Sequence, residues 1–329
     1  MRLSIAEAHG LAEKVLTRLG YREDEAKVAV PHLIDCELRG LEYAGFARML
    51  SIVDRIDRLG HSGREITVTK ETAVSAAIDG ADKVGYLVAQ RATDIAIDKA
   101  LKQGVSIVGA NETWYTGMLS FYAEQAAAKD LVIMIASNAS PWVAPYGGTE
   151  GRFGTNPICF GFPTADDPVI WDIGTSDIIH AQVVLARRLG KKIPEGVAYG
   201  PDGRPTTDPA TALQGAFSAW GGPRGSGLAI VVQLFGMMAG SPMMPGEMTS
   251  FGMVIMAARP DLLTDLGAFK KEASAYAEAI RGTRPVEGGG PVRMPFDRSR
   301  QLRAERVAQG YIEVDDTIHE KIMAVVNRA

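Results

Sequence analysis

The hydrophobic pattern of this 329-residue chain changes character twice, and this change limits the folds open to it. The first sixty residues have helical periodicity, with a capping-box spacing at Ser4 and Glu7 and a glycine stop at Gly20. From about Glu65, short β-branched runs alternate with helical stretches, and helices return near the C-terminus. We therefore expect a mixed α/β (α+β) core with helical segments at both chain ends.

The same periodicities give approximate element bounds. Helices are expected at 23–39, 46–59, 82–102, 117–129, 264–281, 297–309 and at the C-terminus, and strands at 66–69, 105–110, 131–139, 157–163, 168–173, 251–258 and 311–314.

Length and composition narrow the class of protein. A chain of 329 residues exceeds what one core usually supports, so about two domains are expected. The 39 acidic and 35 basic residues nearly balance, which argues against a nucleic-acid partner or a membrane-surface patch. Cys36 and Cys159 lie far apart without a CxxC motif, so we expect unpaired thiols, a reducing cytoplasm and no metal site.

The stretch from Gly225 to Gly246 contains no charged residue and is near the length of a membrane span. It is interrupted by Gln233, Gly236 and Pro242. We therefore interpret its first part as a helix that is hydrophobic all round and buried between layers.

Common catalytic motifs are missing from the sequence. No G-x-G-x-x-G follows a strand, and the P-loop, H-E-x-x-H and G-x-S-x-G patterns are also absent. A nucleotide would therefore need a loop system other than the Rossmann one.

Three segments have the composition of sites. The first, 137–157, is a long Asn-, Pro- and Gly-rich loop with Asn138, Thr155 and Asn156 as polar handles for a phosphate or an amide, although such residues also build plain turns.

The second segment, 171–180, places Asp172 at a strand end beside a helix N-terminus, where a carboxylate can orient a base or a ribose. Thr175 and Ser176 follow, and His180 is either a site residue or an ordinary helix histidine. The third segment, 221–227, puts Arg224 and Gly225 at the start of the apolar helix, as an anion site or as a plain loop with a solvated arginine.

Together these segments resemble the malate/L-lactate dehydrogenase superfamily, which is not of Rossmann type and includes L-sulfolactate, ureidoglycolate, 2,3-diketogulonate and cyclic imino acid oxidoreductases. The resemblance spans nearly the whole chain. It rests on LRG at 38–40 with Gly45 and Arg48, on NASPWVAPYGG at 138–148, GTNPICFGFPT at 154–164, WDIGTS at 171–176, IPEGVAYGPDGRPTTDPATAL at 193–213 and GSGLAIVVQLF at 225–235.

The resemblance implies a helical substrate and dimerisation domain from both chain ends (1–115 with 296–329) and a central NAD(P)-binding domain (116–295) with a largely antiparallel sheet. It also implies a homodimer with the active site near the subunit interface, and hydride transfer between NAD or NADP and C2 of a 2-oxo acid or a ring imine. The cofactor residues implied are Asn138, Thr155, Asn156, Asp172, Thr175, Ser176, Arg224 and Gly225. Arg48 matches an arginine suited to a substrate carboxylate, although a solvated helix face is the plainer interpretation.

The sequence departs from the family pattern where the resemblance implies two histidines. After LRG the pattern has serine, histidine and glycine, but this chain has Tyr43, Ala44 and Gly45; at the second position Trp114 stands in. A general acid contributes roughly 10²–10⁴-fold, so this loss bears on the chemistry.

Three hypotheses follow. In the first, the substrate is a small 2-oxo or 2-hydroxy acid, and Tyr43, Tyr115 or His180 relays the proton with Asp172 nearby. In the second, the substrate is a ketimine that binds as an iminium against Trp114 and Tyr115. In the third, the protein binds the cofactor without catalysis. Core packing is the plainer interpretation of both Trp114 and Tyr115.

Overall fold

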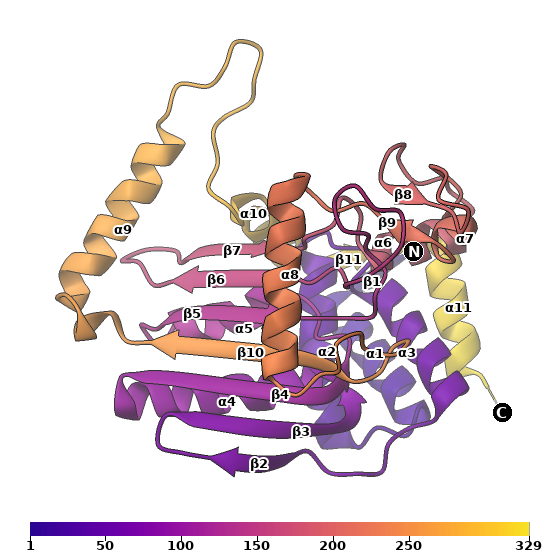
Figure 1. The fold of residues 1–329 in the computed structure, drawn as a ribbon, viewed down its shortest axis with the longest axis horizontal. Helices are drawn as coiled ribbons and strands as arrows, with labels where there is room; N and C mark the ends of the chain where they lie inside the picture. The colour runs from indigo at the N-terminus through magenta and orange to yellow at the C-terminus, as the bar shows by residue number, and fades with distance from the viewer. Residues whose placement is uncertain (329) are drawn as a thin grey trace.

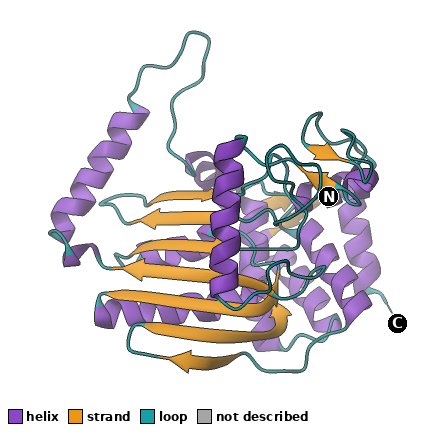
Figure 2. Ribbon diagram, viewed as in Figure 1, coloured by secondary structure: helices purple, strands orange, loops and turns teal. Residues whose placement is uncertain are grey.

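A seven-stranded sheet forms the centre of the computed structural model, which describes residues 1–328 (Figure 1, Figure 2). Its strand order is β2-β3-β4-β10-β5-β6-β7. The bounds are Thr67–Glu71 (β2), Ser75–Val84 (β3), Val105–Trp114 (β4), Val132–Ser137 (β5), Ile158–Phe162 (β6), Val169–Ile173 (β7) and Phe251–Ala258 (β10). All neighbours pair antiparallel except β3 and β4, so the expected largely antiparallel sheet outside the Rossmann class is confirmed.

Helices cover both faces of this sheet (Figure 1). Helix α4 (Gly85–Gln103) makes the crossover between the parallel strands β3 and β4, and α5 (Ser120–Ala127) packs near it against β5 and β6. Helix α8 (Pro223–Met238) lies on the opposite face, over β5 and β10.

The two chain ends form a helical unit beside the sheet (Figure 1). It contains α1 (Ile5–Arg18), α2 (Glu23–Leu38), α3 (Phe46–Leu59) and α11 (Asp316–Val326). The short strand β1 (Arg2–Ser4) pairs antiparallel with β11 (Tyr311–Glu313), which ties the N-terminus to the C-terminal segment. The expected capping box at Ser4 and Glu7 is present.

Two peripheral parts complete the fold. Helix α6 (His180–Arg188), β8 (Ala198–Tyr199), α7 (Pro209–Ala212) and β9 (Ala216–Phe217) form a small cluster around Phe217. The other part is an arm made of a 3-10 turn (Pro260–Leu262), α9 (Leu266–Arg281) and a loop that protrudes before α10 (Asp297–Gln309) (Figure 1).

Strand β3 is the longest element that the sequence pattern missed, and the short elements β1, β8, α7 and β9 were missed as well. Its sequence, SAAIDGADKV, is rich in alanine, aspartate and glycine, which are poor strand formers. It is nevertheless held between β2 and β4, where tertiary pairing overrides local propensity. The other expected strands and helices are present with shifts at their ends. The domain boundary at 115/116 stays a prediction, and β2 to β4 before it belong to the same sheet as β5 to β10.

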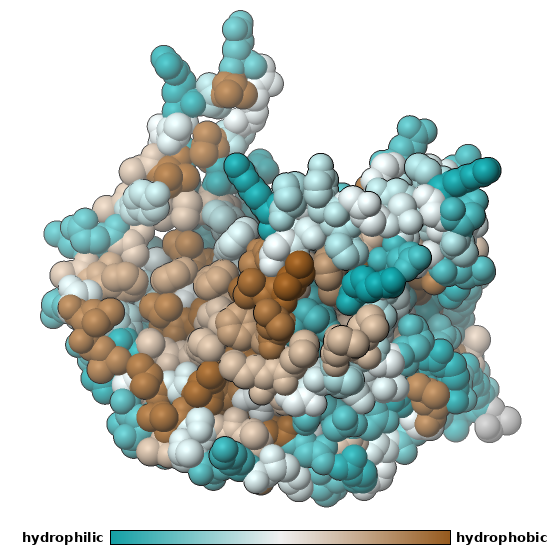
Figure 3. All heavy atoms as spheres, in the orientation of Figure 1, coloured by the Kyte–Doolittle hydropathy of each residue, from teal (hydrophilic) through white to brown (hydrophobic). Residues whose placement is uncertain are grey.

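The prediction that the apolar helix is buried on all sides is wrong. One face of α8 packs on the sheet through Ala229 and Val232, but Leu234 and Met238 on the other face are 56% and 58% exposed. In Figure 3 a hydrophobic area is visible over α8. Among residues 1–328, no helix combines the length and apolar content needed to cross a bilayer.

Candidate active site

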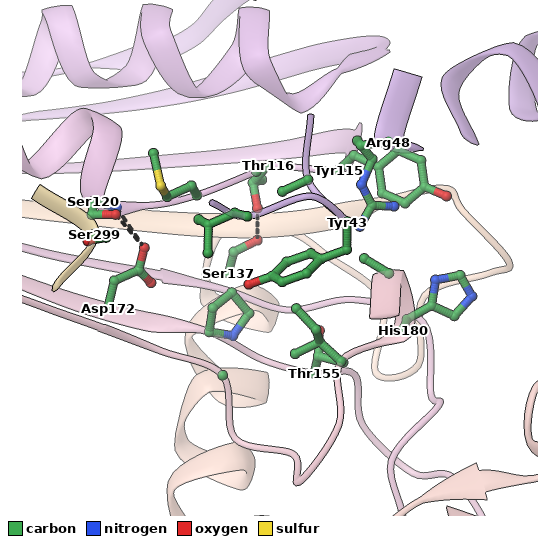
Figure 4. A pocket seen from close by; sticks show the side chains of 18 of the residues that line it. Tyr43, Arg48, Tyr115, Thr116, Ser120, Ser137, Thr155, Asp172, His180 and Ser299 are labelled. Atoms are coloured by element: carbon green, nitrogen blue, oxygen red, sulfur yellow. Dashed lines mark hydrogen bonds between the residues drawn. The ribbon is translucent and has the colours of Figure 1, made fainter. Parts of the chain in front are cut away.

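A cavity of about 700 Å³ lies where the helical unit meets one end of the sheet. Its walls come from the start of α3, the turn after β4, the loop after β5, the end of β7, the start of α6 and the segment before α10. The cavity brings together seven of the residues expected from the sequence: Tyr43, Arg48, Tyr115, Asn138, Thr155, Asp172 and His180. All of these except Asn138 are labelled in Figure 4.

Arg48 on α3 is a half-buried cation at the wall of the cavity. Its guanidinium carbon lies 3.9 Å from the centroid of the Tyr115 ring. Its Nη1 atom is buried without a hydrogen-bond partner, and no carboxylate among residues 1–328 forms an ion pair with it. Nearby Arg188, by contrast, donates to the Ser51 hydroxyl and pairs with Asp54. A guanidinium with unused donors in a cavity is a ready partner for a carboxylate.

Tyr115 reaches its place through an unusual backbone conformation. It follows directly after β4 and has a positive φ of 53°, which non-glycine residues rarely adopt. This turn puts the ring face under the Arg48 guanidinium. Since that face is occupied by a cation of the chain itself, it supports Arg48.

Asp172 near the end of β7 lies at the other side of the cavity (Figure 4). Its Oδ2 atom accepts hydrogen bonds from the backbone N–H of Ser120 at 2.8 Å and from the Ser120 hydroxyl at 2.9 Å. Burial raises the pKa of Asp172, and the two hydrogen bonds from Ser120 counteract part of this rise. The helix N-terminus that holds Asp172 is thus that of α5, of which Ser120 is the first residue, whereas the sequence pointed to the helix that follows Asp172 in the chain, α6.

Tyr43 projects into the middle of the cavity from the turn before α3 (Figure 4). Arg48, Tyr115 and His180 lie to one side of it, and Asp172, Ser120 and Ser299 to the other. Burial raises the pKa of Tyr43 to about 12. The phenol therefore keeps its proton throughout the neutral range and can act as a hydrogen-bond donor there.

His180 is the first residue of α6 and lines the cavity. Its ring stacks on that of Trp142, with centroids 3.9 Å apart and planes 15° apart. Burial, with the charges of Arg48, Arg187 and Arg188, lowers the pKa of His180 to about 3. The imidazole is therefore neutral at neutral pH and holds no imidazolium proton to give away.

Trp114 does not line the cavity, because it points into the core. Its Nε1–H donates to the Asp82 carbonyl oxygen at 3.0 Å, and the Arg55 guanidinium lies 4.6 Å from its ring centroid. The ring face expected for an iminium substrate is thus covered by another residue.

Five expected cofactor residues also lie outside the cavity lining: Asn156, Thr175, Ser176, Arg224 and Gly225. The Asn156 amide donates to the Ala229 carbonyl and to Gln233, while Thr175 donates to the Thr155 and Asn156 carbonyl oxygens. The Ser176 hydroxyl is buried without a partner. Arg224 is exposed on the first turn of α8, and Gly225 packs so close to Trp220 that a Cβ would lie 1.6 Å from the Trp220 carbonyl oxygen. Their roles at a cofactor stay predictions.

Asn138 lines the cavity, but its amide is already used. Its Nδ2 donates to the Ser241 hydroxyl at 3.0 Å, and its Oδ1 accepts from the Gly252 backbone N–H at 2.7 Å. Asn138 therefore fixes the loop after β5 to β10 and leaves the cavity wall in place.

Sequence reasoning missed Trp142, Arg293 and Arg298 as cavity residues. A signal existed for Trp142, the one large aromatic side chain at the start of the glycine-rich loop. Arg293 lies in segment 284–295, whose Pro- and Gly-rich composition is typical of a loop and gives no sign of a site. The local sequence could not predict that Arg293 and Arg298, near the C-terminus, lie in the same cavity as Tyr43.

The cavity walls suit a nicotinamide dinucleotide. Its volume falls within the range of small-molecule sites. Arg293 and Arg298 have no acidic partner among residues 1–328 and provide donors for phosphate oxygens. The Asp172 carboxylate and the Thr155 hydroxyl offer acceptors for ribose hydroxyls or an amide N–H. These four residues would hold the cofactor.

Known proteins resemble this chain over its whole length. Residues 3–323 match the family model described as malate/L-lactate dehydrogenase. A malate/(S)-sulfolactate dehydrogenase of Methanothermus fervidus is 31% identical, covering 99% of this chain and 98% of the relative. A (2R)-3-sulfolactate dehydrogenase (NADP(+)) of Chromohalobacter salexigens is 32% identical over 92% of both chains, and a Delta(1)-pyrroline-2-carboxylate reductase of Burkholderia ambifaria is 28% identical over 99% and 97%. The crystal structure of a dehydrogenase from Sinorhizobium meliloti superposes with a TM-score of 0.91 at 29% identity, covering 99% of this chain and 98% of that one.

Proposed function

This chain belongs to the malate/L-lactate dehydrogenase family of NAD(P)-dependent oxidoreductases, and we propose that its cavity transfers hydride to or from C2 of a small 2-oxo or 2-hydroxy acid bound by Arg48. The observation that carries this proposal is the half-buried Arg48 guanidinium, which has a free Nη1 and no acidic partner among residues 1–328. A planar guanidinium binds a carboxylate through two parallel hydrogen bonds. NAD(P)H supplies the hydride when bound, and Arg48 orients the acid.

Tyr43 is the proposed proton donor. Reduction of a carbonyl leaves an alkoxide that needs a proton, and the Tyr43 phenol is protonated at neutral pH because burial raises its pKa to about 12. Of the other candidates, His180 is neutral, and the Tyr115 ring supports Arg48. Tyr43 also lies between Arg48 and Asp172, in the middle of the cavity (Figure 4). This placement supports a donor that reaches the oxygen on C2 while the carboxylate is held at Arg48.

Reduction of a ketimine is the second candidate. Asp172 favours it, since a half-buried carboxylate in the cavity can stabilise an iminium. An iminium needs no acid at the moment of hydride transfer. The cation–π support expected from Trp114 and Tyr115 is weaker, because Arg55 and Arg48 cover those rings. We therefore place the carbonyl substrate first.

The assembly we propose is a homodimer in the cytoplasm. The outer face of α8 leaves Ile230, Val231, Leu234 and Met238 about half exposed, and a second copy of the chain would remove this surface from water. The buried free thiols of Cys36 and Cys159 suit a reducing compartment. Sedimentation of the wild type and of Leu234→Glu tests the dimer. A wild-type monomer would contradict it.

A substrate panel tests the reaction. NADH and NADPH oxidation is measured with small 2-oxo acids, each with and without ammonia or methylamine. Turnover without amine supports the 2-oxo acid, whereas turnover only with amine supports the imine. Cofactor binding without any turnover would instead support a family member that has lost catalysis.

Arg48→Ala tests the carboxylate site. We expect KM for the acid to rise about 100-fold, because a charge-assisted bidentate contact is lost. Arg58→Ala is the matched control, since Arg58 is exposed on the same helix. An unchanged KM in Arg48→Ala would remove Arg48 from substrate binding.

A further inference from the structure

The Arg48 side of the cavity contains a second polar atom without a partner. The Nδ1 atom of His180 is buried and forms no hydrogen bond, and His180 lines the same cavity as Arg48. Figure 4 shows both side chains on the same side of Tyr43. A buried polar atom left unpaired costs free energy, so a ligand that satisfies it is favoured.

The His180 ring is fixed before any ligand arrives. It stacks on Trp142 at a centroid distance of 3.9 Å. The Trp142 Nε1–H donates to the Glu247 carboxylate at 3.2 Å, which holds the indole from its other end. A ligand that binds Nδ1 therefore meets a pre-oriented group and does not have to order it.

The surroundings of His180 favour an anion. Arg48 faces it from α3, and Arg187 and Arg188 lie on its own helix. Three guanidinium charges disfavour a second cation there, whether imidazolium or iminium. A neutral imidazole can still donate one N–H, from whichever nitrogen carries the proton.

We propose that His180, as the neutral Nδ1–H tautomer, is a second ligand of the substrate carboxylate, donating to one carboxylate oxygen while Arg48 binds the other. The proposal rests on the proposed function, because it needs a carboxylate at Arg48. It assigns His180 to substrate binding and removes it from proton transfer. If the substrate is an imino acid, the proposal places its carboxylate, and not its iminium nitrogen, next to Arg48 and His180.

Three substitutions at His180 distinguish the role of its Nδ1 atom from that of its Nε2 atom. The amide introduced by His180→Asn would reach about the position of Nδ1, that of His180→Gln about the position of Nε2, and His180→Phe keeps a flat ring on Trp142 without a donor. With the 2-oxo acid that the panel identifies, we expect KM to rise about 10- to 100-fold in His180→Phe and His180→Gln. His180→Asn should stay within about threefold of the wild type, and kcat and the Kd of NAD(P)H should change little in all three.

The outcomes distinguish this inference from the proposed function. If Arg48→Ala raises KM but His180→Phe does not, His180 is not a carboxylate ligand and the Arg48 site stands. If neither changes KM, both proposals fail. A fall in kcat with unchanged KM in His180→Phe would assign His180 to the chemistry and overturn the binding role.

Histidine nitrogen NMR gives a readout independent of turnover. The probe is oxamate, a 2-oxo acid analogue that accepts no hydride, added to ¹⁵N-histidine-labelled protein with NADH. His180→Phe assigns the resonance among the five histidines. We expect a protonated Nδ1 that shifts on oxamate addition, and this shift should be absent in Arg48→Ala. An Nε2–H tautomer that persists with oxamate bound would overturn the proposal.

Discussion

The two sides of the cavity differ in how their polar groups are satisfied. At one side, Asp172 accepts two hydrogen bonds from Ser120 at the N-terminus of α5, so its charge is supported within the chain. At the other, Arg48 and His180 each keep a buried nitrogen without a partner. Asp172 is therefore held in place before any ligand binds, whereas the unpaired nitrogens of Arg48 and His180 are left for a ligand to satisfy. The contrast supports the proposal that the substrate carboxylate binds at the Arg48 side.

The largest effect is expected at Tyr43, which stands between the two sides. Tyr43→Phe should lower kcat for a 2-oxo acid by about 10²–10⁴-fold, because the phenolic proton donor is lost. KM should change far less, since Arg48 is intact. Tyr115→Phe is the control, because it removes a cavity hydroxyl and keeps the ring under Arg48. Steady-state rates decide the matter, and an unaffected kcat in Tyr43→Phe would exclude it as the sole acid.

Glu37 stabilises the start of the helix that carries Arg48, and its protonation makes the free energy of unfolding depend on pH. Its carboxyl accepts from the Phe46 backbone N–H at 2.6 Å, at the start of the helix that carries Arg48. Burial raises the pKa of Glu37 to about 8. Between its ordinary pKa and this value the folded protein holds a proton that the unfolded chain releases, so the free energy of unfolding falls as pH rises.

Glu37→Gln should remove this dependence, because glutamine stays neutral and can still accept from Phe46. Urea unfolding is measured between about pH 5 and 9, a range that roughly spans the ordinary and the raised pKa of Glu37. Over this range the free energy of unfolding of the wild type should fall by at most about 4–5 kcal/mol relative to that of the variant. Exposed Glu42→Gln serves as the control. Parallel pH profiles for wild type and Glu37→Gln would refute a protonated Glu37.

The fold was predictable where local pattern and tertiary setting agree. The capping box at Ser4 and the strand 251–258 were both identified from the sequence. Strand β3 was missed, since alanines and aspartates become a strand only between two partners. Helix α8 was misjudged for a related reason: uniform hydrophobicity does not say which face meets the sheet.

The sequence predicted many of the residues of the site, but it did not predict their protonation states or which distant segments come together there. Arg48, Asp172 and His180 were all singled out, and the cavity brings them together. Their protonation could not be predicted, because the low pKa of His180 depends on burial and on three arginines from two helices. Arg293 was out of reach for the same reason, since only the folded chain carries its loop to the cavity.

Ser120→Ala tests the satisfied side. It removes one of the two hydrogen bonds to Asp172, so the free energy of unfolding should fall by about 1.5–3 kcal/mol. KM for a 2-oxo acid should stay near the wild-type value, because the substrate carboxylate binds elsewhere. Ser299→Ala, at the same side of the cavity, is the control for loss of a hydroxyl. A large rise in KM with unchanged stability would reverse the roles assigned to the two sides.

The smallest effect is expected from the ring beneath Arg48. Tyr115→Leu removes a cation–π contact of about 0.5–2 kcal/mol, so KM should rise about 2- to 30-fold while kcat stays within a few-fold. Tyr115→Phe keeps the ring face and should leave KM near the wild-type value, which separates the ring from its hydroxyl. Because Tyr115 acts only through Arg48, Tyr115→Leu should add little in an Arg48→Ala background. Full additivity in that double-mutant cycle would mean that Tyr115 contacts the substrate itself, and the unsatisfied side would then extend beyond Arg48 and His180.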